Sequence, residues 1–217
     1  SRLRQLSAEV DDRVLLVMRA YFEKPRTSLG WKGLIYDPDL DDTGNISKGL
    51  RLARHILLEI AQLGVPTATE LLEPIIPQYV TDLLSWCAIG ARTAESQIHR
   101  QMASGLSMPI GLKNATDGSM KVAVEAIQTA TSPHTFIGIT GQGRVGLFHT
   151  KGNRFAHLVL RGGTSGPNYE TEYIAFAREL MLRYGLIPNI LVDCSHDNSR
   201  KQPRRQREVM HRVIEQV

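Results

Sequence analysis

The stretch that decides the fold is Met18–Gly33, which reads MRAYFEKPRTSLGWKG. It continues an apolar run, Arg13–Met18, of the kind found in strands that are buried on both faces of a parallel α/β sheet. Pro25 fixes the backbone direction, and Lys24 and Arg26 beside it are suited to phosphate oxygens. The stretch therefore predicts a strand followed by a phosphate-binding loop. The alternative is a solvated basic loop.

Strand and helix patterns alternate along the rest of the chain, which predicts a mainly parallel sheet with helical crossovers in one domain, 1–217. Between Pro133 and Ala156 the helical period disappears and glycine-punctuated β segments replace it, which predicts an inserted β-hairpin (133–156). Helices are predicted from Asn45, Pro77, Ala94, Asp117, Tyr169 and near Pro203. The predicted strands of the main sheet are Arg13–Met18, Thr67–Leu71, Ala88–Ala91, Met108–Lys113, Ala156–Arg161 and Asn189–Cys194.

Composition restricts the class of protein. A hydrophobic content of 42% over 217 residues is enough for one buried core, and the net charge of +4 suits anionic ligands. The basic run Ser199–Arg207 lacks interleaved aromatic residues, so we interpret it as the solvated start of a surface helix and expect no nucleic-acid partner. Without a long apolar segment or a signal-peptide pattern, we expect no membrane partner and a cytoplasmic location. We expect the 2 cysteines, Cys87 and Cys194, to be small residues of the core rather than parts of a disulfide framework.

Polar residues stand at the ends of the predicted strands. The carboxyl ends of parallel strands meet on one side of a sheet, where βα loops build the active sites of barrel enzymes. Each residue alone could be a surface charge or a helix cap, but their equivalent positions favour a shared site. These residues are Arg19, Glu70, Arg92, Lys113, Arg161 and His196.

Five segments, in chain order, resemble the class I 3-deoxy-D-arabino-heptulosonate-7-phosphate (DAHP) synthases, which begin the shikimate pathway of aromatic amino acid biosynthesis. They are MRAYFEKPRTSLGWKG at 18–33, GARTAESQIHR at 90–100, GLKNATDGS at 111–119, LRGGTSGPNYE at 160–170 and DCSHDNSRKQ at 193–202. The resemblance runs essentially from end to end. It implies a (β/α)8 TIM barrel, of which this chain holds strands two to seven.

The resemblance also implies a reaction and a site. The family is a metal-dependent transferase that condenses phosphoenolpyruvate with erythrose 4-phosphate and releases phosphate. Lys24 and His196 resemble its catalytic residues, and Asp193 and Asn198 are expected to orient His196. Phosphoenolpyruvate would be bound by Arg19, Lys24, Arg92, Lys113 and Arg161, and erythrose 4-phosphate by Lys24, Pro25, Arg26 and Thr27.

Part of the family's metal set is missing from this sequence. The motif Gly-Pro-Cys-Ser-Ile-His of the first barrel strand is absent, as are the glutamate and aspartate that follow the last strand, which leaves His196 as the one metal ligand. The complete enzyme would use a divalent metal (Mn, Fe, Co or Zn). A catalytic metal needs about three protein ligands, so we expect weak metal binding and no activity from these 217 residues alone. Two open edge strands would also favour a homo-oligomer, a dimer or tetramer.

An aromatic amino acid is the effector that the resemblance implies. Its pocket would involve Pro77, Gln78, Leu106, Ser107, Phe136 and Gly138. Gly138 leaves room for a phenolic hydroxyl, so we favour tyrosine over phenylalanine; the alternative is that Gly138 only bends a strand.

Two other functions remain open. A Schiff-base aldolase on the same barrel would use Lys113 as its nucleophile, because a lysine desolvated at a strand end can take that role. In the other alternative, the chain is a non-catalytic fragment that binds anions through its lysine and arginine side chains and catalyses no reaction.

Overall fold

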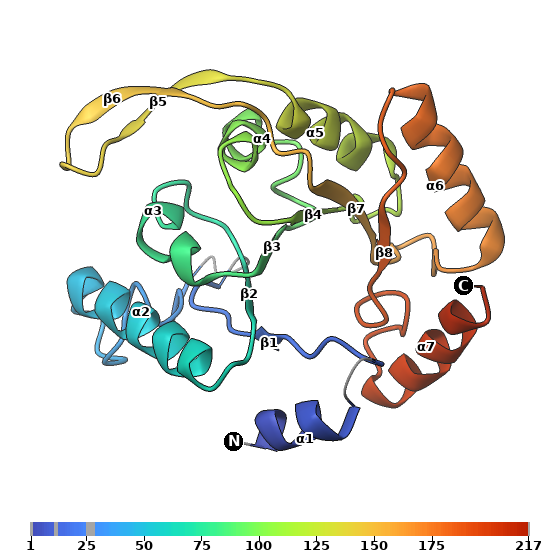
Figure 1. Cartoon of the computed structure of the whole chain (residues 1–217), viewed down its shortest axis with the longest axis horizontal. Coiled ribbons are helices and arrows are strands. Elements are labelled where there is room, and N and C mark those ends of the chain that lie inside the picture. The colour runs from blue at the N-terminus through green and yellow to red at the C-terminus, as the bar shows by residue number, and fades with distance from the viewer. Residues whose placement is uncertain (1, 11–12, 25–28, 217) are drawn as a thin grey trace. The chain divides into compact units, whose positions relative to one another are not determined.

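The computed structural model describes residues 2–10, 13–24 and 29–216 (Figure 1). Its contacts divide the chain into two compact units, Ser1–Ala88 and Ile89–Val217, and each is described by itself. In both units parallel strands alternate with helices.

The first unit is built on three parallel strands. Strand β1 pairs with β2 through Met18 and Thr67, and β2 pairs with β3 through Ala68 and Trp86. The last residue of β3 already belongs to the second unit. The elements are α1 (Arg2–Val10), β1 (Met18–Arg19), α2 (Ile46–Gln62), β2 (Thr67–Glu70), α3 (Pro77–Val80), the 3₁₀ helix η1 (Thr81–Leu83) and β3 (Trp86–Ile89).

Helix α2 begins where the sequence predicts. The Asn45 side chain accepts a hydrogen bond from the Lys48 backbone N–H at 3.2 Å, which satisfies one of the free donors of the first turn. Gly64, at φ +74°, adopts the left-handed conformation that ends many helices. Between them, Ala53 and Leu57 are fully buried on one face, as the apolar spacing requires.

The predicted strand Arg13–Met18 is wrong over most of its length. Only Met18–Arg19 forms β1, and Val14 and Leu15 are 59% and 80% exposed rather than buried on two faces. An apolar run becomes a strand only where a second strand offers hydrogen bonds, and among the described residues β2 pairs with β1 only at Met18 and Arg19.

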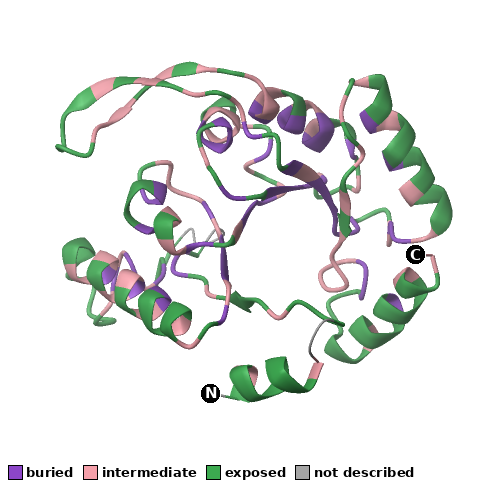
Figure 2. Cartoon of the chain, viewed as in Figure 1, coloured by how far each residue is buried: buried purple, intermediate pink, exposed green. Residues whose placement is uncertain are grey.

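The second unit contains three further parallel strands, with β4 paired to β7 and β7 paired to β8. Helix α5 packs against β4 and β7, and both the helix and the strands contain buried residues (Figure 2). Ala123, Val124 and Ile127 are buried on the helix, and Leu112 and Leu158 are fully buried on the strands. The elements are α4 (Gln97–Ser104), β4 (Ile110–Lys113), α5 (Lys121–Thr131), β7 (Ala156–Leu160), α6 (Thr171–Arg183), β8 (Ile190–Val192), the 3₁₀ helix η2 (Pro203–Arg205) and α7 (Gln206–Ile214).

Helices α4 and α5 begin three and four residues later than predicted, at Gln97 and Lys121. Before α5, the Asp117 carboxylate accepts a 2.8 Å hydrogen bond from the Ser119 backbone N–H and closes a turn. Such local side-chain bonds compete with the helix, so Asp117 belongs to the turn and not to the helix.

The inserted hairpin is confirmed. Strands β5 (Thr135–Ile139) and β6 (Val145–His149) pair antiparallel (Figure 1). The rings of Phe136 and Phe148 stack with centroids 6.0 Å apart. Burial alternates along both strands, so one face of the hairpin is more covered than the other (Figure 2).

No helix among the residues that the structure describes is both long and apolar enough to cross a membrane.

Candidate active site

The predicted site residues do follow strand ends. Arg19 ends β1, Glu70 ends β2 and Lys113 ends β4, while Arg161 comes directly after β7. Arg92 is exposed in the turn that follows β3, and His196 lies in the turn after β8. In each unit, the predicted residues therefore lie at or after the carboxyl ends of parallel strands, which is where barrel enzymes carry their site residues.

Lys113 and Arg161 emerge on one face of the β4 and β7 pair. Lys113 lies opposite Val159, and Arg161 follows Val159 by two residues. Side chains alternate along a strand, so all three point to the same side. Both cations are nearly inaccessible, at 6% and 3% exposure. Two cations on one face at the carboxyl ends of neighbouring strands are an arrangement that suits the binding of an anion.

Arg161 forms an ion pair with a residue that the sequence interpretation did not select. Its Nη2 lies 2.7 Å from the Asp197 Oδ2, and its Nη1 donates to the Gly162 carbonyl at 3.3 Å. The other Asp197 oxygen lies 3.3 Å from the Lys201 amine. Burial acts to raise the pKa of Asp197, but Arg161 and Lys201 outweigh it and lower that pKa, so Asp197 is an anion at neutral pH.

Three buried asparagines tie the loops of this site together. The Asn114 carboxamide oxygen accepts hydrogen bonds from the Arg161 backbone N–H at 2.7 Å and from the Asn168 amide at 3.1 Å. Asn168 in turn accepts from the Gly162 backbone N–H at 2.7 Å, and its own backbone N–H donates to Asn198 at 2.9 Å. These side chains fix the chain on both sides of Arg161, which positions the guanidinium.

The glycine pair after Arg161 serves backbone packing. A Cβ on Gly162 would lie 2.7 Å from the Asn198 nitrogen, and a Cβ on Gly163 would lie 2.2 Å from the Gly118 nitrogen. The chain's own backbone therefore occupies the space beside this pair, where only glycine fits.

His196 is oriented by Asp193, as predicted. Its Nδ1 lies 2.6 Å from the Asp193 Oδ2, which leaves Nε2 as the nitrogen available for coordination. Burial opposes ionisation of Asp193, but the His196 and Ser195 hydrogen bonds hold its pKa at about 2. Asn198, the second expected positioning residue, instead donates to the backbone carbonyls of Leu160 and Asp193, at 3.1 and 2.9 Å.

The turn that carries His196 contains unusual backbone conformations. His196, Arg200 and Lys201 have φ values of 48°, 52° and 58°, in the left-handed region that residues other than glycine rarely adopt. Such conformations cost of order 1–3 kcal/mol each and persist where surrounding contacts impose them.

The described part of the chain does not provide a complete site for a catalytic metal. Within residues 2–10, 13–24 and 29–216, no group of three or more histidine, cysteine, aspartate or glutamate side chains could hold an ion. A catalytic site needs about three protein ligands, and His196 supplies one.

In the first unit, aromatic side chains contact the predicted cations. The Arg19 guanidinium lies 4.4 Å from the centre of the Tyr21 ring, and the Tyr21 hydroxyl donates to the Glu70 carboxylate at 3.1 Å. The Lys24 amine lies 5.7 Å from the centre of the Trp31 ring. Pro25, Arg26 and Thr27 lie outside the described residues.

Glu23 is a buried carboxyl that the sequence interpretation missed. It is 6% exposed, accepts a hydrogen bond from the Tyr36 hydroxyl at 3.3 Å and another from the Glu73 backbone N–H at 3.2 Å. Burial is the main reason that its pKa rises to about 6, against the hydrogen bonds, which lower it. The same burial, followed by the charge of Glu23, raises the pKa of Tyr36.

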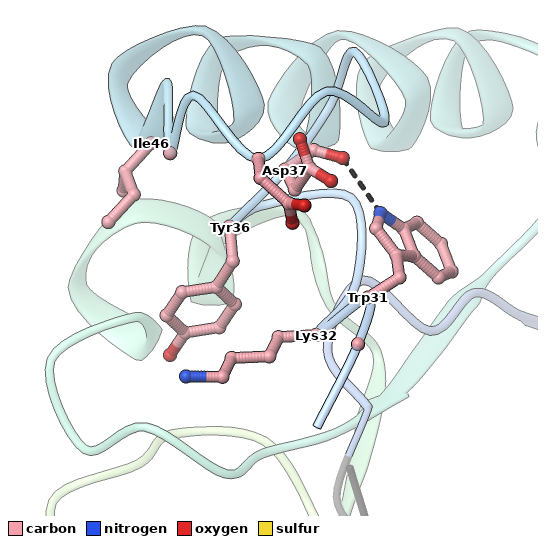
Figure 3. Close-up of a pocket in the computed structure, with 8 residues that line it drawn as sticks. Trp31, Lys32, Tyr36, Asp37 and Ile46 are labelled. Atoms are coloured by element: carbon pink, nitrogen blue, oxygen red, sulfur yellow. Dashed lines mark hydrogen bonds between the residues drawn. The ribbon is translucent and has the colours of Figure 1, made fainter. Parts of the chain in front are cut away.

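Tyr36 also lines an open pocket of about 260 Å³ (Figure 3). Its wall is fixed in part by the Trp31 indole, which donates to the Asp37 carbonyl at 2.7 Å. The lining residues are Gly30, Trp31, Lys32, Tyr36, Asp37, Asp42, Gly44 and Ile46.

The expected effector residues fall in both units. Pro77 is buried at the start of α3 and Gln78 is exposed. In the second unit, the Ser104 hydroxyl at the end of α4 lies 2.6 Å from the hydroxyl of Thr150, the residue after β6. Leu106 and Ser107 follow this contact by two and three residues. Near Phe136, a Cβ on Gly138 would lie 2.8 Å from the Phe148 ring. The space beside Gly138 thus holds Phe148.

Comparison with known proteins decides the family. The family model described as "DAHP synthetase I family" matches residues 1–217. The chain belongs to the DAHP synthetase I family. It is 52% identical to the Tyr-sensitive phospho-2-dehydro-3-deoxyheptonate aldolase of Salmonella typhimurium, over 100% of this chain and 60% of that protein. It is 49% identical to the Phe-sensitive enzyme of Escherichia coli, over 100% of this chain and 62% of that protein.

A solved structure of a family member supports the fold directly. The phospho-2-dehydro-3-deoxyheptonate aldolase of Francisella tularensis matches with a TM-score of 0.95 and 48% identity, over 99% of this chain and 63% of that chain. The predicted fold class, an incomplete (β/α)8 barrel with an inserted hairpin, is confirmed. The chain thus spans about 60% of the length of the relatives it matches.

Proposed function

We propose that the protein condenses phosphoenolpyruvate with erythrose 4-phosphate to give DAHP and phosphate, the first step of the shikimate pathway. The observation that carries the proposal is the pair of buried cations, Lys113 and Arg161, on one face at the carboxyl ends of β4 and β7. Membership of the DAHP synthetase I family names the reaction.

Phosphoenolpyruvate carries a carboxylate and a phosphate, and it needs several donors held in fixed directions. The Arg161 fork can bind two oxygens of one such group, and Lys113 supplies a point charge beside it. Arg92, Arg19 and Lys24 are the further cations that we assign to this substrate. We assign Lys24, Pro25, Arg26 and Thr27 to erythrose 4-phosphate.

In the reaction, C3 of phosphoenolpyruvate bonds to the aldehyde carbon of erythrose 4-phosphate, water adds to C2, and phosphate leaves. We propose that the family's divalent metal supports this chemistry in the complete protein, with His196 as one ligand and Asp193 holding its ring. The remaining ligands would have to come from residues outside this chain.

Kinetics of the full-length protein test the assignment. Replacing Arg161 with glutamine removes two donor groups from the proposed phosphoenolpyruvate site, so the KM for phosphoenolpyruvate should rise at least about tenfold. Arg54→Gln is the matched control. Arg54 lies on α2, forms an exposed ion pair with Asp82 and has no role in the proposed site. Equal KM values in the two variants would contradict the assignment.

A Schiff-base aldolase is the second candidate, favoured by the burial of Lys113 at a strand end. Borohydride treatment with a keto substrate would trap a covalent adduct on Lys113 only in this mechanism. An adduct absent from Lys113→Arg would support it, while turnover without an adduct would support the DAHP synthase reaction.

We propose that an aromatic amino acid inhibits the protein through Pro77, Gln78, Leu106, Ser107, Phe136 and Gly138. The named relatives include Tyr-sensitive and Phe-sensitive enzymes. We still propose tyrosine as the inhibitor. The space beside Gly138, which we expected to hold its phenolic hydroxyl, is filled by Phe148. Inhibition curves with tyrosine and phenylalanine, for the parent and Phe136→Ala, decide between the two. If the inhibition curves of Phe136→Ala equalled those of the parent, the hairpin would not be part of the inhibitor site.

We also propose that the chain forms a homo-oligomer. Among the described strands β1 pairs only with β2 and β8 only with β7, and Leu15 beside β1 is 80% exposed. Strand edges and apolar side chains of this kind favour pairing with another chain. Light scattering that gives the mass of a monomer would refute the proposal.

A further inference from the structure

The guanidinium of Arg161 already binds a carboxylate of its own chain. Arg161 is 4% exposed at its side chain, and Asp197, its partner at 2.7 Å, is 20% exposed. Solvent therefore screens the pair on one side only, that of Asp197. The charge that would attract an anion to Arg161 is largely balanced while this contact holds.

Asp197 and an oxyanion ligand compete for the charge of the same guanidinium. One side of the Arg161 fork donates to the Gly162 carbonyl at 3.3 Å, and the other side faces Asp197. A guanidinium has five N–H groups, so a phosphate or carboxylate that binds Arg161 can use the groups that face neither Gly162 nor Asp197, but it then shares the positive charge with Asp197. It would also stand beside a negative charge, and this repulsion grows with the charge of the ligand.

The Asp197 carboxylate has a second partner to which it can turn. Its other oxygen lies 3.3 Å from the amine of Lys201, whose side chain is 66% exposed. The backbone is held more firmly, because the Asp197 N–H donates to the Arg161 carbonyl at 3.1 Å. A side-chain rotation towards Lys201 can release Arg161 without moving the turn that carries His196.

We propose that Asp197 is a specificity-determining residue: an internal counter-ion of Arg161 with which an incoming oxyanion must compete. It weakens the binding of every anion at Arg161, most of all the multiply charged ones. The inference rests on the proposed phosphoenolpyruvate site, where such a counter-ion would also speed the departure of product phosphate. A carboxylate that merely oriented Arg161 for its ligand would have the opposite effect.

Inorganic phosphate is the probe, measured by calorimetric titration of the 217-residue chain. Asp197→Asn removes the charge and keeps the shape, so the Kd for phosphate should fall roughly three- to thirtyfold. The Kd for acetate, which carries one charge, should fall less. Asp82→Asn is the control for net charge, because Asp82 pairs with the exposed Arg54, and it should leave both values unchanged.

Asp197→Glu separates charge from shape. It keeps the carboxylate, so phosphate should bind no more tightly than to the parent chain. Arg161→Gln should abolish the gain made by Asp197→Asn. Weaker or unchanged phosphate binding in Asp197→Asn would overturn the inference, as would an equal gain in Asp197→Glu. Circular dichroism of each variant identifies a loss of folding, in which case the same comparison is made with Asp197→Ser.

The proposed function is tested separately. An absence of turnover with both substrates in the full-length protein would refute the DAHP synthase assignment while leaving the phosphate comparison intact. A raised KM in Arg161→Gln without any gain in phosphate binding in Asp197→Asn would refute the counter-ion and leave the assignment in place.

Discussion

The carboxamide oxygen of Asn114 accepts a 2.7 Å hydrogen bond from the backbone N–H of Arg161, 47 residues further along the chain. The Asn114 amide donates at the same time to the Gly162 carbonyl at 3.0 Å. One side chain thus satisfies buried backbone groups on either side of the peptide bond after Arg161. The position of the guanidinium depends on this contact.

Asn114→Ala should therefore destabilise the protein strongly. It leaves the buried Arg161 backbone N–H without this acceptor and removes one of the two donors to the Gly162 carbonyl, so the free energy of unfolding should fall by roughly 1–3 kcal/mol. Urea denaturation of the 217-residue chain measures the change. Asn189→Ala, at an exposed position before β8, is the control and should change stability by less than about 0.5 kcal/mol. Equal effects would show that the Asn114 contacts contribute little.

Gly163 should not tolerate a side chain. A Cβ there would lie 2.2 Å from the Gly118 nitrogen and 2.5 Å from the Asp117 carbonyl carbon, both of them backbone atoms that cannot rotate away. Gly163→Ala should cost about 1–3 kcal/mol or more of unfolding free energy. Gly141, in the hairpin turn, would have no neighbouring atom within 4 Å of an added Cβ, so Gly141→Ala should be close to neutral. Thermal melts of the two variants should differ clearly, and coincident melts would refute the packing role.

The sequence predicted well what depends on neighbours in the chain. The start of α2 after Asn45 and the hairpin between Pro133 and Ala156 both follow from short-range chemistry. The strand Arg13–Met18 failed because β structure needs a distant partner, and apolar character alone does not supply one. Asp117 failed because a turn bond competed with the helix.

The candidate site divides in the same way. Lys113, Arg161 and His196 could be found because cations and imidazoles after strands are visible in the sequence. Asp197 and Glu23 were missed because their roles come from contacts with Arg161 and Tyr36, 36 and 13 positions away, which no local pattern encodes. Polar residues next to the predicted cations in the sequence, such as Asn114 after Lys113, could have indicated further residues of the site.

We expect the 217-residue polypeptide to be inactive in the condensation of phosphoenolpyruvate with erythrose 4-phosphate. Among the described residues, no group of three or more histidine, cysteine, aspartate or glutamate side chains could hold a metal ion, and a catalytic metal needs about three protein ligands. A phosphate-release assay at saturating manganese and both substrates measures the outcome, with the full-length protein as the positive control. Turnover near that of the full-length protein would require substitute ligands.

Glu23 should make stability depend on pH in an uncommon direction. Burial raises its pKa from 4.5 to about 6, so the folded chain binds the proton more tightly than the unfolded chain. The stabilisation by the protonated carboxyl is complete below about pH 4.5 and is lost as the pH rises through about 6, a change of about 2 kcal/mol. Glu23→Gln keeps a neutral side chain of similar shape at every pH, so it should match the parent in acid and exceed it near neutrality. Urea denaturation of both proteins between about pH 4.5 and about pH 7 gives the difference in unfolding free energy, which cancels the titration of all other groups. A difference that stays constant over this range would mean that Glu23 is not the buried acid that the structure describes.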